Sequence, residues 1–176
     1  MKFEAVDPLS SNYVSLHSHS HYSLLDSMTK IEDAVARSKE LGHSAYSLTD
    51  HGVVAGHIRA YLECQKHGVK FIPGMEAYWT DEHTDKVRKS RHITILAKNN
   101  KGLENLYKMV TWSNVPVDKG GGFFYRPRIS WKELEKYKEG LIILSGCMNS
   151  PSNHSFIHEG YEQGKDVVKR LKSIFG

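Results

Sequence analysis

Residues 45–76 read AYSLTDHGVVAGHIRAYLECQKHGVKFIPGME, and this stretch decides the fold. Its first four residues, 45–48, form an apolar run of strand length, and the polar TDHG that follows has the composition of a loop. A helix then ends at Gly68, and a second apolar run over 69–72 predicts another strand. The apolar positions expected on the helix are Ile58, Tyr61 and Leu62.

The same alternation of strand and helix continues on both sides of this stretch. Upstream, a strand over 13–16 runs into His17, and a helix follows that Thr29 and Glu32 open as a capping box. Downstream, strands are expected over 93–96 and 141–144, and helices over 103–110, 131–137 and 157–175. Such alternation predicts an α/β fold with a mainly parallel sheet, barrel-like or open, and functional side chains at the carboxyl ends of its strands.

Length and composition limit the possible classes of protein. At 176 residues the chain fits one domain, and a barrel would be incomplete because barrels often need more than about 200 residues. No apolar run is long enough to span a bilayer and residues 1–13 do not form a secretory signal, which predicts a cytoplasmic protein. Two cysteines exclude a disulfide framework, and the net charge of +4 permits nucleic acid as a partner without requiring it.

Histidine is the exception in this composition, because the chain has 11 and many lie in its first third. Candidate metal ligands stand where the expected strands end: His17 and His19, then His51, then Glu76, and finally Cys147. Two histidines two residues apart on an extended segment project to the same face and can share one divalent ion. A carboxylate such as Glu76 can bridge two ions about 3.5 to 4 Å apart. Any single histidine is more often packed or exposed than a ligand, so it is the ordered set that indicates a metal site.

Several longer motifs resemble one family. VSLHSHSHYSLLDSMTKIEDAV (14–35) and SLTDHGVVAGHIRAY (47–61) are similar to the first two motifs of the PHP domain in bacterial-type DNA polymerase III alpha subunits, the C-family replicative polymerases. IPGMEAYW, HITILAKNNKGLENLYKMV, FFYRPRISWKELEKY and EGLIILSGC follow in the same order. The resemblance implies a single PHP domain over 1–176 with a distorted, incomplete PHP-type (β/α) barrel. It implies two or three divalent ions, of zinc, manganese or iron.

The resemblance also implies a ligand set and catalytic residues. By motif position, His17, His19 and Glu76 would hold one ion, Glu76, His92 and Cys147 a second, and Asp26 and His51 a third. Glu76, His19 and His51 are the implied catalytic residues. The family's last ligand pair, an Asp-x-His after a further strand, does not occur in the segment that follows Cys147, so the first and third ions would each lack a ligand. That absence suggests a truncated chain, half of a split gene, or a domain kept for structure.

Other polar residues carry weaker expectations. His21 matches no ligand position and is expected in a loop, His57 is expected exposed on its helix, and Cys64 is expected as a packed thiol. Basic residues before the strand expected over 93–96 and near the YRPR motif are usually solvated, but in a polymerase they could touch DNA or neighbouring domains. These nucleic-acid candidates are Arg88, Lys89, Arg91, Arg126 and Arg128.

Three functions remain open on the sequence alone. The first is a polymerase-associated PHP domain, either a metal-dependent 3′–5′ exonuclease or a scaffold, with downstream polymerase domains, other replisome subunits and DNA as partners. The second is a free-standing PHP metallophosphatase that acts on a small phosphate monoester, as a histidinol phosphatase does. The third is a non-catalytic interaction module. Metal content separates the first two from the third, and the substrate separates them from each other.

Overall fold

The computed structural model describes residues 13–81 and 88–176. Its strands are β1 (Ala45–Leu48), β2 (Lys70–Trp79), β3 (Arg91–Ala97), β4 (Phe123–Phe124), β5 (Arg126–Ile129) and β6 (Leu141–Leu144). Its helices are α1 (Ile31–Glu40), α2 (His57–His67), α3 (Asn100–Ser113), α4 (Trp131–Tyr137), α5 (Pro151–His158) and α6 (Tyr161–Phe175), with a 3-10 turn at Val117–Lys119. The α/β class is therefore as predicted, and none of the described helices is long and apolar enough to cross a membrane.

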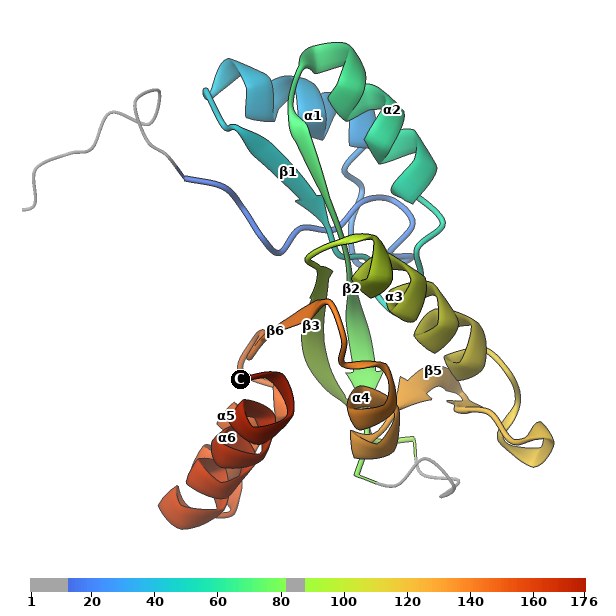
Figure 1. Cartoon of the computed structure of the whole chain (residues 1–176), viewed down its shortest axis with the longest axis vertical. Coiled ribbons are helices and arrows are strands. Elements are labelled where there is room, and N and C mark those ends of the chain that lie inside the picture. The colour runs from blue at the N-terminus through green and yellow to red at the C-terminus, as the bar shows by residue number, and fades with distance from the viewer. Residues whose placement is uncertain (1–12, 82–87) are drawn as a thin grey trace, which may run out of the picture.

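The long strand β2 organises the sheet (Figure 1). Its first half pairs in parallel with β1, from Ala45 opposite Lys70 to Leu48 opposite Pro73. Its second half pairs with β3 on one edge and with β5 on the other. The strand order is β4-β5-β2-β3-β6, with β1 paired to β2 off this path, so the described sheet is open.

The sheet is mixed, and the expectation of mainly parallel strands is wrong. β3 runs antiparallel to both of its neighbours, β2 and β6, and β4 is antiparallel to β5, while only β1 and β5 run parallel to β2. The physical reason is that only residues 80–90 separate β2 from β3, and a parallel return needs a crossover connection of about a dozen residues or more.

Three local expectations also need correction. Residues 13–16 form no strand; instead the next segment lies along the end of β1, where Ser18 accepts a hydrogen bond from the Thr49 backbone N–H. β2 runs on to Trp79, so Glu76 lies inside the strand and not after it. The single helix expected over 157–175 is two helices separated at Gly160, which has φ +116°.

The N-terminal caps of the helices show which capping patterns in the sequence form in the structure. Ser130 and Glu133 form the capping box of α4, and Asn99 caps α3 by accepting a hydrogen bond from the Gly102 N–H at 2.9 Å. The box expected at the start of α1 does not form, because Lys30 is the N-cap residue and Glu32 pairs with Arg59 of α2 instead.

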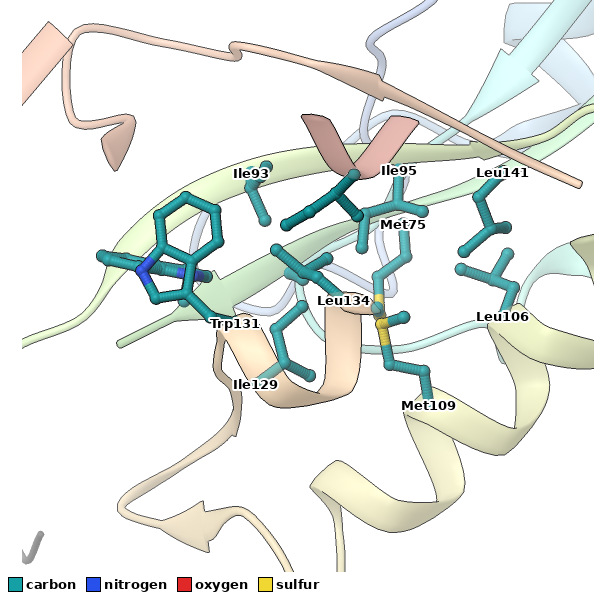
Figure 2. Close-up of a cluster of buried hydrophobic side chains, with 12 residues drawn as sticks. Met75, Ile93, Ile95, Leu106, Met109, Ile129, Trp131, Leu134 and Leu141 are labelled. Atoms are coloured by element: carbon teal, nitrogen blue, oxygen red, sulfur yellow. The ribbon is translucent and has the colours of Figure 1, made fainter. Parts of the chain in front are cut away.

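Two apolar cores lie along β2. The smaller one joins α1, α2 and β1, and the larger one joins β2 and β3 to α3, α4, β6 and the end of α6 (Figure 2). Because side chains alternate along a strand, the odd-numbered residues of β2 and β3 enter the larger core. These are Met75, Ala77, Trp79, Ile93 and Ile95. The even-numbered Glu76, Tyr78, His92 and Thr94 therefore share the opposite face.

Helix α2 packs with the face that the sequence did not predict. Ile58, Tyr61 and Leu62 are exposed, whereas His57, Ala60 and Cys64 are buried. The expectation that His57 is exposed is wrong: its side chain is 3% exposed, and Nε2 donates a hydrogen bond to the Gly74 carbonyl at 2.8 Å. Cys64 is a packed thiol as expected, and burial raises its pKa to about 11.

We predict that Gly102→Ala destabilises the fold although alanine favours helices by about 1 kcal/mol. A Cβ at Gly102 would lie 1.8 Å from the carbonyl oxygen of Gly140, which is backbone that cannot rotate away. The cost of such overpacking is about 1 to 3 kcal/mol. Urea unfolding should show a lower midpoint for Gly102→Ala and almost no change for the exposed neighbour Lys101→Ala. A rise in the midpoint of Gly102→Ala would contradict the close approach of α3 to residue 140.

We also predict that His57 makes stability depend on pH. Burial lowers the pKa of His57, and its hydrogen bond to Gly74 only partly offsets that effect. A histidine whose folded-state pKa lies below its unfolded value of about 6.5 loses stability as pH falls from that value through the folded pKa. His57→Gln keeps a donor for Gly74 but does not titrate. Between pH 7.5 and 5.5, the free energy of unfolding should fall more steeply for the parent than for His57→Gln. The other histidines contribute equally in both proteins, so their contributions cancel when the two slopes are compared. Equal slopes for the two proteins would show that His57 is protonated without cost.

Candidate metal centre

The candidate metal centre lies on the face of β2 opposite the larger core. Register places Glu76 across from Thr94 and Tyr78 across from His92, so Glu76 and His92 are diagonal neighbours on one face. His51 continues the line of β1 and forms an isolated parallel bridge with Glu76. Since β3 is antiparallel, its first residues lie beside the carboxyl-terminal half of β2. That direction explains why His92, which was expected at the start of its strand and is the second residue of β3, still reaches the site.

The carboxylate of Glu76 is the centre of the cluster. Its Oε2 lies 2.8 Å from Nε2 of His17 and 2.9 Å from Nε2 of His19, while Oε1 lies 3.2 Å from Nδ1 of His92. The Glu76 side chain is 2% exposed. The two oxygens of one buried carboxylate thus face different histidines, as in a carboxylate that bridges two ions.

The remaining predicted ligands lie around this carboxylate. Nδ1 of His51 is 3.5 Å from Oε2 of Glu76, and Nε2 of His51 is 3.4 Å from Oδ2 of Asp26. Sγ of the exposed Cys147 is 3.8 Å from Nδ1 of His92. The structure therefore brings all seven predicted ligands to one place. Three overlapping groups could each hold an ion: His17, His19 and Glu76; His19, Asp26 and His51; and His51, Glu76 and His92.

The residues fit divalent ions by spacing and by chemistry. Ligand atoms about 2.1 Å from one ion, at octahedral to tetrahedral angles, lie about 3.0 to 3.4 Å apart. The ring nitrogens of His17 and His19 are 3.1 Å apart, and both lie within 2.9 Å of the same Glu76 oxygen. Nδ1 of His51 is buried without a hydrogen-bond partner among the described residues. A cation would satisfy this nitrogen and the converging lone pairs of the cluster together.

The charges of the cluster are strongly coupled. Burial alone would raise the pKa of Glu76, but hydrogen bonds with His17, His19 and His92 outweigh burial and hold that pKa far below its ordinary value. Burial lowers the pKa of His51. Burial would also lower the pKa of His19, but its hydrogen bond with Glu76 and the negative charge of Glu76 together raise it. Glu76 is therefore ionised at neutral pH and available as a ligand.

A buried acid behind the cluster was missed as a functional residue by the sequence reasoning. Asp50 is 1% exposed and accepts hydrogen bonds from the backbone N–H and hydroxyl of Ser20 and from the hydroxyl of Ser23. Ser23 Oγ also lies 3.1 Å from Nδ1 of His19 and accepts a hydrogen bond from the backbone N–H of His51. Asp50 and Ser23 thus orient two candidate ligands. The serines between the histidines of HSHSHYS were the available signal.

The basic candidates divide into three kinds. Arg128 is wrong as a nucleic-acid residue, because its side chain is fully buried, donates to the Gly122 carbonyl and packs on Phe124. Arg91 lies 3.5 Å from Asp81 and 3.7 Å from Glu159, so its charge is compensated within the fold. Exposed side chains remain at Arg88, Lys89 and Arg126. His21 lies in a loop as expected, where its ring packs on Tyr22.

Comparison with known proteins gives a consistent result. Residues 15–176 match the family described as PHP domain. The DNA polymerase III subunit alpha of Aquifex aeolicus is 38% identical over 182 residues, covering 96% of this chain and 15% of that protein. The same subunit from Borreliella burgdorferi is 38% identical over 172 residues, covering 94% and 15%, and that of Helicobacter pylori strain 26695 is 36% identical over 176 residues, covering 93% and 14%. The chain thus spans about one seventh of the length of these relatives.

We predict that Ser23→Ala weakens metal binding without unfolding the protein. The change removes the group that holds the His19 ring and the His51 backbone, and loss of such an outer partner lowers metal affinity about 10- to 100-fold. Competition against a zinc-binding dye should show this loss. Ser38→Ala, which removes a hydroxyl bonded only within α1, is the matched control. Equal metal affinity in Ser23→Ala and the parent would mean that the ligands are held without Ser23.

Proposed function

The chain belongs to the PHP domain family, and from that premise we propose that it is the metal-binding phosphoesterase domain of a replicative DNA polymerase alpha subunit. Its proposed reaction is the metal-dependent removal of nucleotides from a 3′ end. The proposed domain spans residues 1–176. Polymerisation would belong to parts of the protein outside this chain, which spans about 15% of its relatives. As part of a replicase it would act in the cytoplasm, with DNA and the polymerase domains as partners.

One observation carries this proposal: both oxygens of the buried Glu76 carboxylate face imidazole nitrogens from different segments of the chain. A carboxylate in this position, surrounded by imidazole nitrogens, suits a pair of cations that share it as a bridge. A merely structural histidine cluster would not need a buried ionised acid at its centre. Burying a carboxylate without compensation of its charge costs on the order of several kcal/mol.

The distances support three proposed sets of metal ligands. His17, His19 and Glu76 would hold one ion, and His51, Glu76 and His92 a second, with Cys147 beside His92 as a further ligand. His19 and His51 with Asp26 would hold a third. The thiol of Cys147 favours zinc in the second set, and the other two sets also suit manganese or iron.

The side chains have separate tasks in the proposed reaction. Bound divalent ions would neutralise phosphate charge and lower the pKa of an attacking water. Glu76 stays ionised and fixes the spacing of the two sets, while His19 and His51 are shared between sets and align them. Asp50 and Ser23 keep the His19 ring in place. Tyr78, whose ring stacks on His51 with centroids 5.5 Å apart, closes one side of the cluster to water.

The absent Asp-x-His pair does not by itself prevent catalysis. None of the described histidines or acids after Cys147 belongs to a candidate group. Each of the three groups nevertheless contains three side chains, and a catalytic zinc site commonly has three protein ligands and one open position.

We predict that His19→Ala lowers bound metal and phosphoester hydrolysis together. His19 belongs to two of the three groups, so the loss of metal affinity should exceed the about 10- to 100-fold loss of an outer partner. Elemental analysis gives the metal content, and a 3′-tailed DNA primer and a small phosphate ester serve as parallel substrates. His21→Ala changes a neighbouring histidine of the same motif outside every group, and it should retain both properties.

The outcomes separate the candidate functions. Hydrolysis of the primer but not of the small ester supports the exonuclease, and the reverse supports a free-standing phosphatase. If the native protein contains no bound metal and its melting temperature does not change when a chelator is added, both catalytic functions are contradicted and the scaffold role remains.

A further inference from the structure

A short hairpin beside the metal cluster carries an exposed tyrosine between two arginines. β4 and β5 are joined by Tyr125, whose side chain is 62% exposed. The guanidinium carbon of Arg88 lies 5.0 Å from the centre of the Tyr125 ring, and that of Arg126 lies 5.9 Å from it. We call Arg88, Tyr125 and Arg126 the hairpin surface.

The hairpin surface is connected to the metal cluster by stacked rings. Arg126 lies over the ring of Tyr78, with its guanidinium carbon 4.7 Å from the ring centre. The Tyr78 ring also stacks on the ring of His51, with centroids 5.5 Å apart and an interplanar angle of 16°, and meets the ring of His92 edge-on at 5.4 Å. The Tyr78 ring therefore separates the guanidinium group of the exposed Arg126 from the candidate metal ligand His51.

The hairpin is held in this place by a close approach at Gly52. Gly52 follows His51 with φ +64°, and a Cβ there would lie 2.7 Å from Cγ of Pro127 and 3.2 Å from Tyr78. Pro127 belongs to β5, next to Arg126. The absence of a side chain at Gly52 lets the hairpin pack directly against the loop that carries His51.

The charges of the hairpin surface are not used by the fold. Within the described ranges, neither Arg88 nor Arg126 forms an ion pair, in contrast to Arg91, which is paired with Asp81 and Glu159. Tyr125 adopts φ +64°, a left-handed conformation that is uncommon for a side chain of this size. Strain of this kind costs about 1 kcal/mol or more and is often found at binding sites.

We propose that the hairpin surface binds a single-stranded nucleic acid and guides its end to the metal cluster. The arginines would pair with backbone phosphates, and the exposed ring would stack on a base. Stacking platforms between cations suit single strands, because the bases of a duplex are already stacked on one another. This inference rests on the proposed function, since it names the class of substrate that the cluster receives. A small phosphate ester would gain nothing from a stacking ring outside the cluster.

The test measures oligonucleotide binding separately from cleavage. Fluorescence anisotropy with a labelled ten-nucleotide oligo(dT), with oligo(U) and with a duplex of the same length compares the parent with Tyr125→Ala and Arg126→Ala. Each variant should bind both single strands about tenfold more weakly, the size of effect expected for loss of one stacked base. Tyr161→Ala, at another exposed tyrosine that lies beside a lysine, and Arg37→Ala, at an exposed arginine on α1, are matched controls and should bind as the parent does. Melting temperature and metal content establish that each variant is folded.

Each outcome decides one of the two proposals. Unchanged affinity in both hairpin variants, or equal losses for duplex and single strands, overturns the inference even if the parent cleaves DNA. If the metal-loaded parent cleaves no phosphoester while the binding difference persists, the proposed function fails and the nucleic-acid surface stands. Weaker binding of the variants only to oligo(U) would assign the surface to RNA in place of DNA.

Discussion

The ionised carboxylate of Glu76, buried in the middle of β2, is the constraint on which the rest of the structure depends. A carboxylate that is 2% exposed must be compensated, because an isolated buried charge is very costly. Histidines from three other segments supply that compensation, at His17 and His19, at His51 and at His92. His51 and His92 reach the carboxylate only because the strands beside β2 have one particular register and direction, so the position of this acid constrains the pairing of β1, β2 and β3.

The two faces of β2 divide the work between stability and chemistry. Met75, Ala77 and Trp79 point into the larger core, and Glu76 and Tyr78 point to the opposite face. A slip of one residue would exchange the two faces and bury neither set correctly. The apolar core therefore fixes the position of the acid, and the hydrophobic energy that folds the domain also holds the site in register.

The sequence predicted those features that depend on local pattern and missed those that depend on distant partners. The β1–α2–β2 order, the stop at Gly68 and the candidate ligands could all be found from short motifs. The direction of β3 was missed, although no helix was expected between the strands over 69–72 and 93–96, because side-chain alternation is the same in parallel and antiparallel strands. Helix α2 has two faces with helical spacing, and the less apolar one is selected by tertiary contacts, namely the hydrogen bond from His57 to Gly74 and the packing of Ala60 and Cys64 in the smaller core. Arg128 was misjudged because its burial depends on the β4–β5 hairpin, which brings the Gly122 carbonyl and the Phe124 ring to its guanidinium group.

One edge of β2 connects the candidate metal centre to the hairpin surface. Along this edge β1 pairs first, His51 bridges to Glu76, the Gly52 N–H donates to the Glu76 carbonyl, and β5 pairs from Tyr78 onward. The loop bearing His51 and the hairpin bearing Arg126 are thus attached to the same strand within a few residues of each other. Because a paired strand is stiff compared with a loop, their separation is set by backbone hydrogen bonds and not by side-chain rotamers. Any group bound at the hairpin would therefore lie at a fixed offset from the candidate metal centre.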